Sequence, residues 1–309
     1  MKTYFDFNLT GKKLLPYWLL VLIFLVSPYI AFIFSLRNIQ PGETPSVLII
    51  PLFILLILIA FVISFFIIKL NIENLVFNEK HVEFGGYFGK FIDIMILGVF
   101  LTIITIGIYG AWFYRDLHRF FINNSSYNSQ NFQFNGSAKK LFVIILLSII
   151  IPLMILVIIL TTLILKNPEQ ATSYMRFQQL VTIIITIPYM YLLDKWRVNI
   201  DYKNYHISWN TNFWKSCGKI FVEIVLSILT IGIYMPVALV RLYKYFSERT
   251  VANSPEKKLQ FGYDIDQLND FLFIWGQILL TIITIGIYYP WAFCKIGKRI
   301  ISKTYLEEV

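Results

Sequence analysis

The sequence predicts an all-α polytopic membrane protein with short β-strand stretches, built from internal repeats. Hydrophobic residues make up 57% of the 309 and charged residues only 15%, whereas a soluble domain carries roughly 25% charged residues. Four long windows contain no charged side chain, and one phrase, Thr-Ile-Gly-Ile-Tyr, occurs three times. The chain therefore has too few charged side chains to cover a folded surface in water.

The charge-free windows are the first elements to place. They cover residues 15–36, 47–68, 141–165 and 271–294. At about 1.5 Å of rise per helical residue, each can cross a hydrocarbon core of roughly 30 Å. A shorter apolar segment, 177–193, ends near Tyr191 and Trp196, aromatic residues typical of the membrane interface. No small-residue cleavage site follows the first window, so we expect a retained span rather than a signal peptide.

The repeated phrase divides the chain into units. Its copies occupy residues 105–109, 230–234 and 284–288. A second similarity, at nearly the same offset, matches residues 5–8 with residues 132–135. Look-alike segments at a fixed offset indicate duplicated units. We therefore expect one integral membrane domain made of a first repeat, a second repeat and a truncated third, at residues 1–130, 131–257 and 258–309.

Each full unit is expected to hold a short strand, two spans, a second strand-like stretch and the repeated phrase. Alternating polarity on both sides of residues 78–80 predicts a β-hairpin there. The phrase itself predicts a helix break, because glycine accepts backbone angles that other residues resist. In two copies a proline, Pro236 or Pro290, also removes a helix donor. The expected break points are Gly107, Gly232 and Gly286.

Basic and aromatic residues follow each break at helical spacing. This pattern favours a short helix at the headgroup level, with cations that reach lipid phosphates. The alternative is an ordinary helix end with an aromatic belt. The net charge of +9 also fits anionic lipid better than nucleic acid, because the basic residues flank apolar segments. The candidate anionic-lipid contacts are Arg115, Arg119, Arg241, Lys244, Lys295, Lys298 and Arg299.

Two membrane topologies are open. If all seven apolar segments cross, the basic residues divide 13 to 14 between the two sides, which gives no bias. If the three repeated segments enter the membrane and return, only Arg37, Lys166 and Arg176 of the 27 basic residues lie outside. The positive-inside rule then favours four crossings and a cytoplasmic N-terminus. Seven crossings remain the alternative, because Ile94–Tyr114 is long enough to span outright.

One longer pattern resembles a known family. Phe-x-Phe-x-Gly, then an apolar run ending in Thr-Ile-Gly-Ile-Tyr-x-Pro-Trp-Ala, is similar to the YjgN-like family of bacterial inner-membrane proteins. The third copy, Leu280–Ala292, matches best. The first copy has Gly110 and Ala111 before its Trp, and the second lacks the Trp. The resemblance implies a multi-pass protein of the bacterial inner membrane; the family is one of unknown function and implies no catalytic residues.

One ionisable residue inside an apolar segment is a candidate for function. Glu223 lies seven residues before Thr230, and the same slot holds Gly98 and Gln277 in the other copies. If the repeated segments pack against each other, Glu223 and Gln277 would line a polar seam that binds a cation or passes a proton. The favoured interpretation is that Glu223 lies near the membrane interface and simply pairs with Lys219 at i, i+4 spacing.

Other chemistry has little support in the sequence. It contains no catalytic or nucleotide-binding motif, and its three histidines are scattered. We therefore expect no enzyme activity, no cofactor and no metal site. The first expectation is small-solute or ion transport through a repeat interface. The alternative is a non-catalytic protein that binds anionic lipid or a protein partner at the cytoplasmic face. Membrane lipids are the expected partners and nucleic acid is not; a small-molecule partner and a homo-oligomer are left open.

Overall fold

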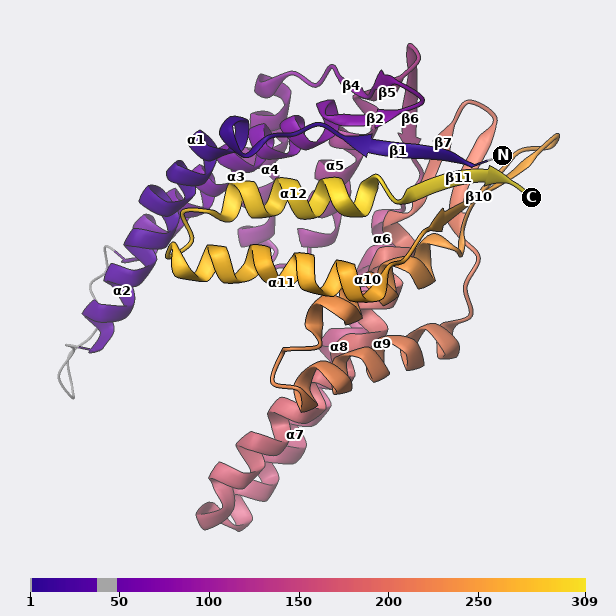
Figure 1. The fold of residues 1–309 in the computed structure, drawn as a ribbon. Coiled ribbons are helices and arrows are strands. Elements are labelled where there is room, and N and C mark those ends of the chain that lie inside the picture. The colour runs from indigo at the N-terminus through magenta and orange to yellow at the C-terminus, as the bar shows by residue number, and fades with distance from the viewer. Residues whose placement is uncertain (1, 38–48) are drawn as a thin grey trace.

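The computed structural model describes residues 2–37 and 49–309. Eleven short strands form one antiparallel sheet at one end of the molecule, and the helices extend from it (Figure 1). The strands are β1 (Thr3–Phe7), β2 (Leu75–Phe77), β3 (Lys80–His81), β4 (Glu83–Phe84), β5 (Ser125–Tyr127), β6 (Gln130–Phe134), β7 (Asn199–Tyr202), β8 (Tyr205–Trp209), β9 (Thr250–Asn253), β10 (Lys258–Tyr263) and β11 (Thr304–Glu308).

Helical segments connect these strands. They are α1 (Gly11–Val21), α2 (Ser27–Arg37), α3 (Ile49–Glu73), α4 (Phe88–Ile104), α5 (Gly110–Asn123), α6 (Ala138–Ile145), α7 (Ile151–Lys166), α8 (Ala171–Arg197), α9 (Phe213–Leu229), α10 (Met235–Ser247), α11 (Gln267–Ile283) and α12 (Tyr289–Ile301). Two π-helical turns, η1 (Leu22–Val26) and η2 (Leu146–Ile150), and one 3-10 turn, η3 (Pro168–Gln170), complete the set. Pro28 and Pro152 each follow a π-helical turn by two residues, and proline lacks the N–H that a regular α-helical turn needs.

The sheet is nearly closed into a barrel. Its strand order is β3-β2-β1-β11-β10-β9-β8-β7-β6-β5-β4. The two strands at the ends of this order, β3 and β4, are separated in the chain by Val82 alone, whose N–H donates to the Leu75 carbonyl at 2.9 Å. The first and last strands also pair, with Thr3 opposite Leu306, so the two chain ends lie side by side (Figure 1).

The expected all-α class with isolated strand stretches is therefore wrong. The strands are two to six residues long, and most pair with strands far away in the sequence. Local alternation cannot reveal such pairing. The local part of the prediction is correct: β2 and β3 form a hairpin, and Asn78 and Glu79 at its turn have φ of 46° and 63°, as tight hairpin turns require.

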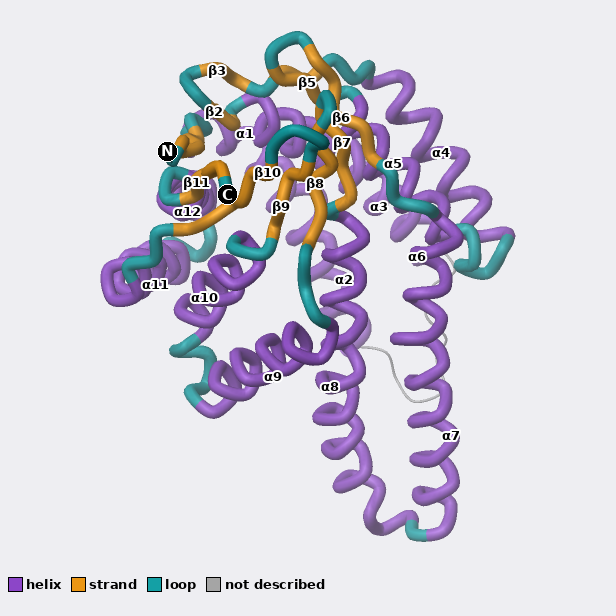
Figure 2. The backbone as a smooth tube through the Cα atoms, turned by 90° about the vertical axis from the view of Figure 1, so that its right-hand side faces the viewer, coloured by secondary structure: helices purple, strands orange, loops and turns teal. Residues whose placement is uncertain are grey.

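Five helical connections, here called excursions, leave the sheet at the end of one strand and return to it at the start of the next. Two are long, α1–α3 and α6–α8, and three are short hairpins, α4–α5, α9–α10 and α11–α12. Neighbouring excursions pack together: α3 on α4, α5 on α6, α8 on α9, α10 on α11, and α12 on α1. The helices therefore form a ring that follows the ring of strands. Figure 2 shows the strands gathered at one end and α7 and α8 reaching furthest from them.

The long excursions supply four helices that are long and apolar enough to cross a membrane. They cover residues 11–34, 51–73, 138–166 and 168–197. The charge-free window 271–294 is different, because a turn at residues 284–288 divides it into two antiparallel helices. Residues 38–48, which hold most of the predicted outer loop at 37–46, lie outside the described part of the chain.

Each Thr-Ile-Gly-Ile-Tyr phrase forms the same tight turn between two helices. In the second copy, Tyr234 N–H donates to Thr230 Oγ1 at 3.0 Å, and Gly232 N–H donates to the Ser227 carbonyl at 2.7 Å. The other two copies repeat both bonds. Gly232 has φ +83° and the preceding Ile231 has φ 51°. The turn therefore needs glycine at its centre, because a side chain with that φ is strained.

This requirement gives a stability prediction. Gly232→Ala is expected to lower the free energy of unfolding by about 1–2 kcal/mol, the cost of a left-handed residue with a Cβ, since no atom lies within 4 Å of the new methyl group. Gly218→Ala is the matched control, because Gly218 lies in the middle of α9 and also has open space around it. There the change should be neutral or stabilising by up to about 1 kcal/mol. Denaturant titration in detergent micelles measures both; equal destabilisation would contradict the turn argument.

Candidate anion-binding site

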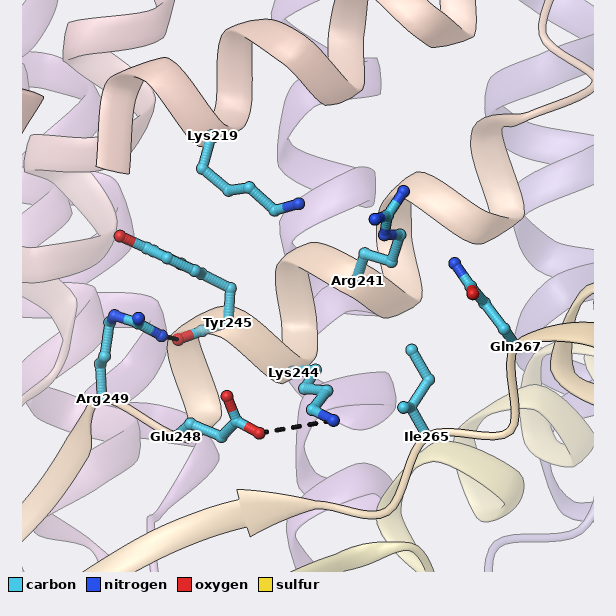
Figure 3. A pocket seen from close by; sticks show the side chains of 8 residues that line it. All are labelled: Lys219, Arg241, Lys244, Tyr245, Glu248, Arg249, Ile265 and Gln267. Carbon is cyan, nitrogen blue, oxygen red and sulfur yellow. Dashed lines mark hydrogen bonds and ion pairs between the residues drawn. The ribbon is translucent and has the colours of Figure 1, made fainter. Parts of the chain in front are cut away.

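A basic cavity of about 320 Å³ lies on the second short hairpin (Figure 3). Lys219 reaches from α9 toward Arg241 on α10, and Lys244 and Tyr245 follow one helical turn later. The lining residues are Lys219, Arg241, Lys244, Tyr245, Glu248, Arg249, Ile265 and Gln267. Residues spaced by three and four share one helix face, so α10 presents its polar side chains to this space.

Local contacts hold the rim of the cavity in place. The Arg249 guanidinium lies 3.7 Å from the centre of the Tyr245 ring, and its Nη1 donates to the Tyr245 carbonyl at 2.9 Å. Lys244 Nζ lies 3.6 Å from a Glu248 carboxylate oxygen. The Tyr245 hydroxyl is 3.3 Å from Ser216 Oγ on α9. These contacts fix the arms of the hairpin and leave the cations facing one shared space.

A buried carboxylate lies between the two arms. Glu223 is only 1% exposed, and its Oε1 accepts from Lys219 Nζ at 2.5 Å and lies 3.7 Å from Arg241 Nε. Its Oε2 has no hydrogen-bond partner within the described chain. Glu223 thus forms the i, i+4 ion pair that its spacing allows. Four cations surround the site against two carboxylates, Glu223 and Glu248, so the cavity is electropositive.

The positions equivalent to Glu223 in the other two hairpins also make their contacts within their own hairpin. In the third hairpin, Tyr288 donates its hydroxyl hydrogen to Gln277 Oε1 at 3.0 Å, and Lys295 Nζ donates to Tyr288 at 2.8 Å. In the first hairpin, a Cβ on Gly98 would lie 2.0 Å from the Phe113 ring, so an aromatic side chain fills the slot. Glu223 and Gln277 therefore lie in separate hairpins, and each hydrogen-bonds within its own.

A second buried network holds the base of the third hairpin. Asp270 is 1% exposed and accepts from Arg299 Nε at 2.7 Å, Lys303 Nζ at 2.6 Å and the Tyr263 hydroxyl at 3.2 Å. Burial alone would raise the pKa of Asp270, but the bonds from Lys303 and Arg299 hold this pKa below its ordinary value. Arg299 is therefore committed to an internal ion pair.

Of the seven predicted lipid-contact cations, only Arg241 and Lys244 line the cavity. Arg115 pairs with Asp116 at 2.6 Å, and Lys298 lies 3.8 Å from Asp6. Arg119 is exposed on α5. The predicted break glycines, Gly107, Gly232 and Gly286, all lie in the turns.

Lys219 and Arg249 were not predicted as anion contacts, and Lys219 was expected only as an ion-pair partner of Glu223. Lys219 lies on the opposite arm of the hairpin, and Arg249 lies beyond the end of α10. The spacing of residues 241, 244, 245 and 248 places those four residues on one helix face, but it gives no signal for Lys219 or Arg249.

Comparison with known proteins supplies a family. The family described as bacterial protein of unknown function (DUF898) matches residues 2–262. The resemblance to the YjgN-like proteins is confirmed, since they belong to this family. Neither a curated protein nor a solved structure matches the chain.

Proposed function

The chain belongs to the DUF898 family of bacterial proteins, and we propose that it is a non-catalytic protein of the inner membrane that binds the phosphate group of anionic lipids. The α9–α10 cavity holds the phosphate. The barrel lies on the cytoplasmic side together with the N-terminus. Four helices cross the membrane, and the three short hairpins enter it only partly and return.

The single sheet supports four crossings over seven. Strands that share backbone hydrogen bonds must lie on one side of a membrane, and β4 pairs with β5 on either side of the first short hairpin. A single crossing by α4 and α5 would separate those two strands. The same argument applies to the hairpins between β8 and β9 and between β10 and β11. Placing the barrel in the cytoplasm also satisfies the positive-inside rule.

The tips of the short hairpins have the surface of a membrane-inserted segment. Ile106, Ile231 and Ile285 are 94%, 93% and 89% exposed, and each has φ near 50°. A β-branched residue is unfavourable in that conformation, and full exposure of isoleucine to water is unfavourable as well. Insertion of the tips into lipid removes the second cost. An exposed isoleucine with this φ occurs in all three turns, and this repetition supports insertion of the tips.

Insertion of the tip would bring the cavity close to the lipid headgroups. From the start of α10 at Met235 to Arg241, the helix rises about 9 Å. Amphipathic segments at membrane surfaces bury their apolar parts roughly 5–10 Å into the headgroup boundary. A tip at Ile231 in the acyl region thus places Arg241 and Lys244 among the phosphates. This combination of an apolar tip with a four-cation cavity is the observation that carries the proposal.

Transport through a repeat interface stays a prediction with less support. Glu223 and Gln277 were expected to meet at one seam, yet each has partners inside its own hairpin. The carboxylate of Glu223 is also neutralised by Lys219 at 2.5 Å.

Removing three rim cations should test the proposal. The variant Arg241→Gln, Lys244→Gln, Arg249→Gln keeps Lys219, so Glu223 retains its ion pair. If each lost cation–phosphate contact costs about 1 kcal/mol, binding should weaken by about 100-fold. The measurement is the Kd of the full-length protein in detergent for short-chain phosphatidylglycerol.

The chain offers a matched control. Lys295 and Lys298 occupy the positions of Arg241 and Lys244 in the third hairpin, and Arg119 corresponds to Lys244 in the first. Replacing these three with Gln removes the same charge outside the cavity. This change reduces only the long-range attraction of the positively charged protein for the anionic lipid, so it should weaken binding by no more than about tenfold. Equal losses in both variants would reject a specific site in the α9–α10 hairpin.

A further inference from the structure

A second cavity lies inside the barrel, at the end that faces the helices. Its volume is about 530 Å³, within the range of roughly 300–1,000 Å³ typical of ligand sites. Its apolar walls include Phe5, Leu75, Val198, Trp209, Phe261 and Ile301. These residues come from β1, β2, β8, β10, α12 and the residue before β7. The cavity thus extends across the mouth of the barrel from β2 to β7.

Aromatic pairs form two parts of the wall. Trp209 stacks on Phe246 of α10 with ring centres 4.2 Å apart, and Phe5 stacks on Phe261 at 5.9 Å. In the sheet, β9, β10 and β11 lie between β8 and β1. The two aromatic pairs therefore line separated parts of the cavity, and the cavity is a space within the curl of the sheet.

The lining offers little to a polar ligand. All eleven lining residues lie in the described chain, and none of them is charged. The Thr304 hydroxyl is 2.8 Å from the Tyr243 hydroxyl and donates to the Ile300 carbonyl at 3.0 Å. Thr250 Oγ1 donates to the Phe246 carbonyl at 2.9 Å. Ser247 and Trp209 supply the remaining polar side-chain groups of the lining. Because the lining carries no charge, a charged ligand would lose its hydration without an ionic partner in exchange.

We propose that the mouth of the barrel binds a hydrocarbon chain, supplied either by a membrane lipid or by a free fatty acid. A flexible chain needs no hydrogen-bond partner and gains free energy by leaving water. Barrel mouths are also frequent ligand sites. The proposal is independent of the anion site, because Tyr243, Phe246 and Ser247 line this cavity from one side of α10 while Lys244, Tyr245 and Glu248 line the basic cavity from another.

Photo-crosslinking of the full-length protein in lipid nanodiscs tests the site. One arm uses palmitic acid carrying a diazirine near the chain end, and the other uses phosphatidylglycerol with the same diazirine acyl chain. After irradiation, peptide mass spectrometry locates the labels. We expect labels at residues 198–209, 243–250 and 301–304 in at least one arm, and the arm that gives them identifies the source of the chain.

Apolar grooves in the spanning helices provide an internal reference. Such grooves include Leu20 and Phe24 against Leu58, and Leu147 and Pro152 against Ile184. Any probe dissolved in the bilayer reaches them. Labels confined to these helices in both arms, or labels of equal yield there and in the barrel, would overturn the proposal.

A filled cavity should exclude the probe. Val198→Trp is expected to reduce labelling of residues 243–250 about tenfold, because the indole occupies the space that the chain needs. Val62→Trp, in the groove between α1 and α3, is the matched control and should leave barrel labelling unchanged. Unchanged barrel labelling in a folded Val198→Trp protein would overturn the proposal, and if this variant does not fold, the label map of the wild type decides alone.

Discussion

Replacing Asp270 with alanine is expected to lower the free energy of unfolding by about 3–5 kcal/mol, the usual cost of removing one member of a buried ion pair. The carboxylate is 1% exposed and has Arg299, Lys303 and Tyr263 as partners. Its loss leaves two cations, each about one quarter exposed, without their counter-charge. Denaturant titration in detergent micelles measures the change.

Glu256→Ala is the control for Asp270→Ala. Glu256 is an exposed carboxylate between β9 and β10, and surface changes of this kind stay within about 0.5 kcal/mol. The triple variant Asp270→Leu, Arg299→Met, Lys303→Met should lose less stability than Asp270→Ala, because it leaves no unpaired charge. A loss of less than about 1 kcal/mol in Asp270→Ala would show that the network contributes little.

The effect of Asp270 should also depend on pH. Its pKa in the folded protein lies below the ordinary value of 3.8, so the ionised form stabilises the fold. This contribution is present in full above the unfolded pKa and is lost as the pH falls through the lower folded pKa. The stabilities of the wild type and Asp270→Ala should therefore differ most near pH 7 and converge in acid.

The position of Asp270 also distinguishes the three short hairpins in structure. Asp270 and Arg299 correspond to Ser216 and Tyr245 in the second hairpin, and to Phe91 and Phe120 in the first. The first pair packs as rings 5.9 Å apart, and the second is 3.3 Å apart through hydroxyls. Only the third hairpin uses a cation in this slot. In the second hairpin a neutral pair occupies this slot. Lys219 and Arg241 instead approach Glu223, and Lys244 approaches Glu248, while their side chains also line the basic cavity.

The sequence predicted the helical part of the fold well, because those signals are local. Three of the four charge-free windows coincide with helices that are long and apolar enough to cross a membrane, and the phrase around Gly232 located a turn. The barrel could not be predicted in the same way. Glu83 and Phe84 alone form β4, and nothing near them in the sequence indicates their pairing with Ser126 and Ser125. The sheet forms because every helical excursion brings the next strand back beside the strand that precedes it.

The candidate site was predicted in part for a similar reason. Arg241 and Lys244 share a helix and follow a recognisable pattern, so their spacing was informative. Lys219 and Arg249 join them only when α9 folds back on α10 and α10 ends beside β9. The pairing of Glu223 with Lys219 could be predicted because the two residues are four positions apart on one helix.

Deleting the last strand is expected to have the largest effect on the fold. A chain ending at Lys303 lacks β11, which pairs with β1 on one side and with β10 on the other. Its removal exposes the backbone groups of two strands at once and opens the ring. It also removes Thr304, which is 6% exposed and contacts the Tyr243 hydroxyl at 2.8 Å. We expect a loss of more than about 5 kcal/mol, a large share of the total stability of an ordinary domain.

Hydrogen exchange distinguishes this opening from a minor loss at the chain end. In the truncated protein, amides of β1 and β10 should lose protection by at least about 1,000-fold, while α6 and α8, on the far side of the ring, keep theirs. A chain lacking only Glu308 and Val309 is the control, because it retains the pairing of Leu306 with both Thr3 and Phe261. Intact protection of β1 in the chain ending at Lys303 would mean that the barrel does not depend on closure by its terminal strands. Among the described strands, β1 and β11 are the only neighbours in the sheet that are not consecutive in the sequence. Their pairing is therefore the step that joins the start of the chain to its end.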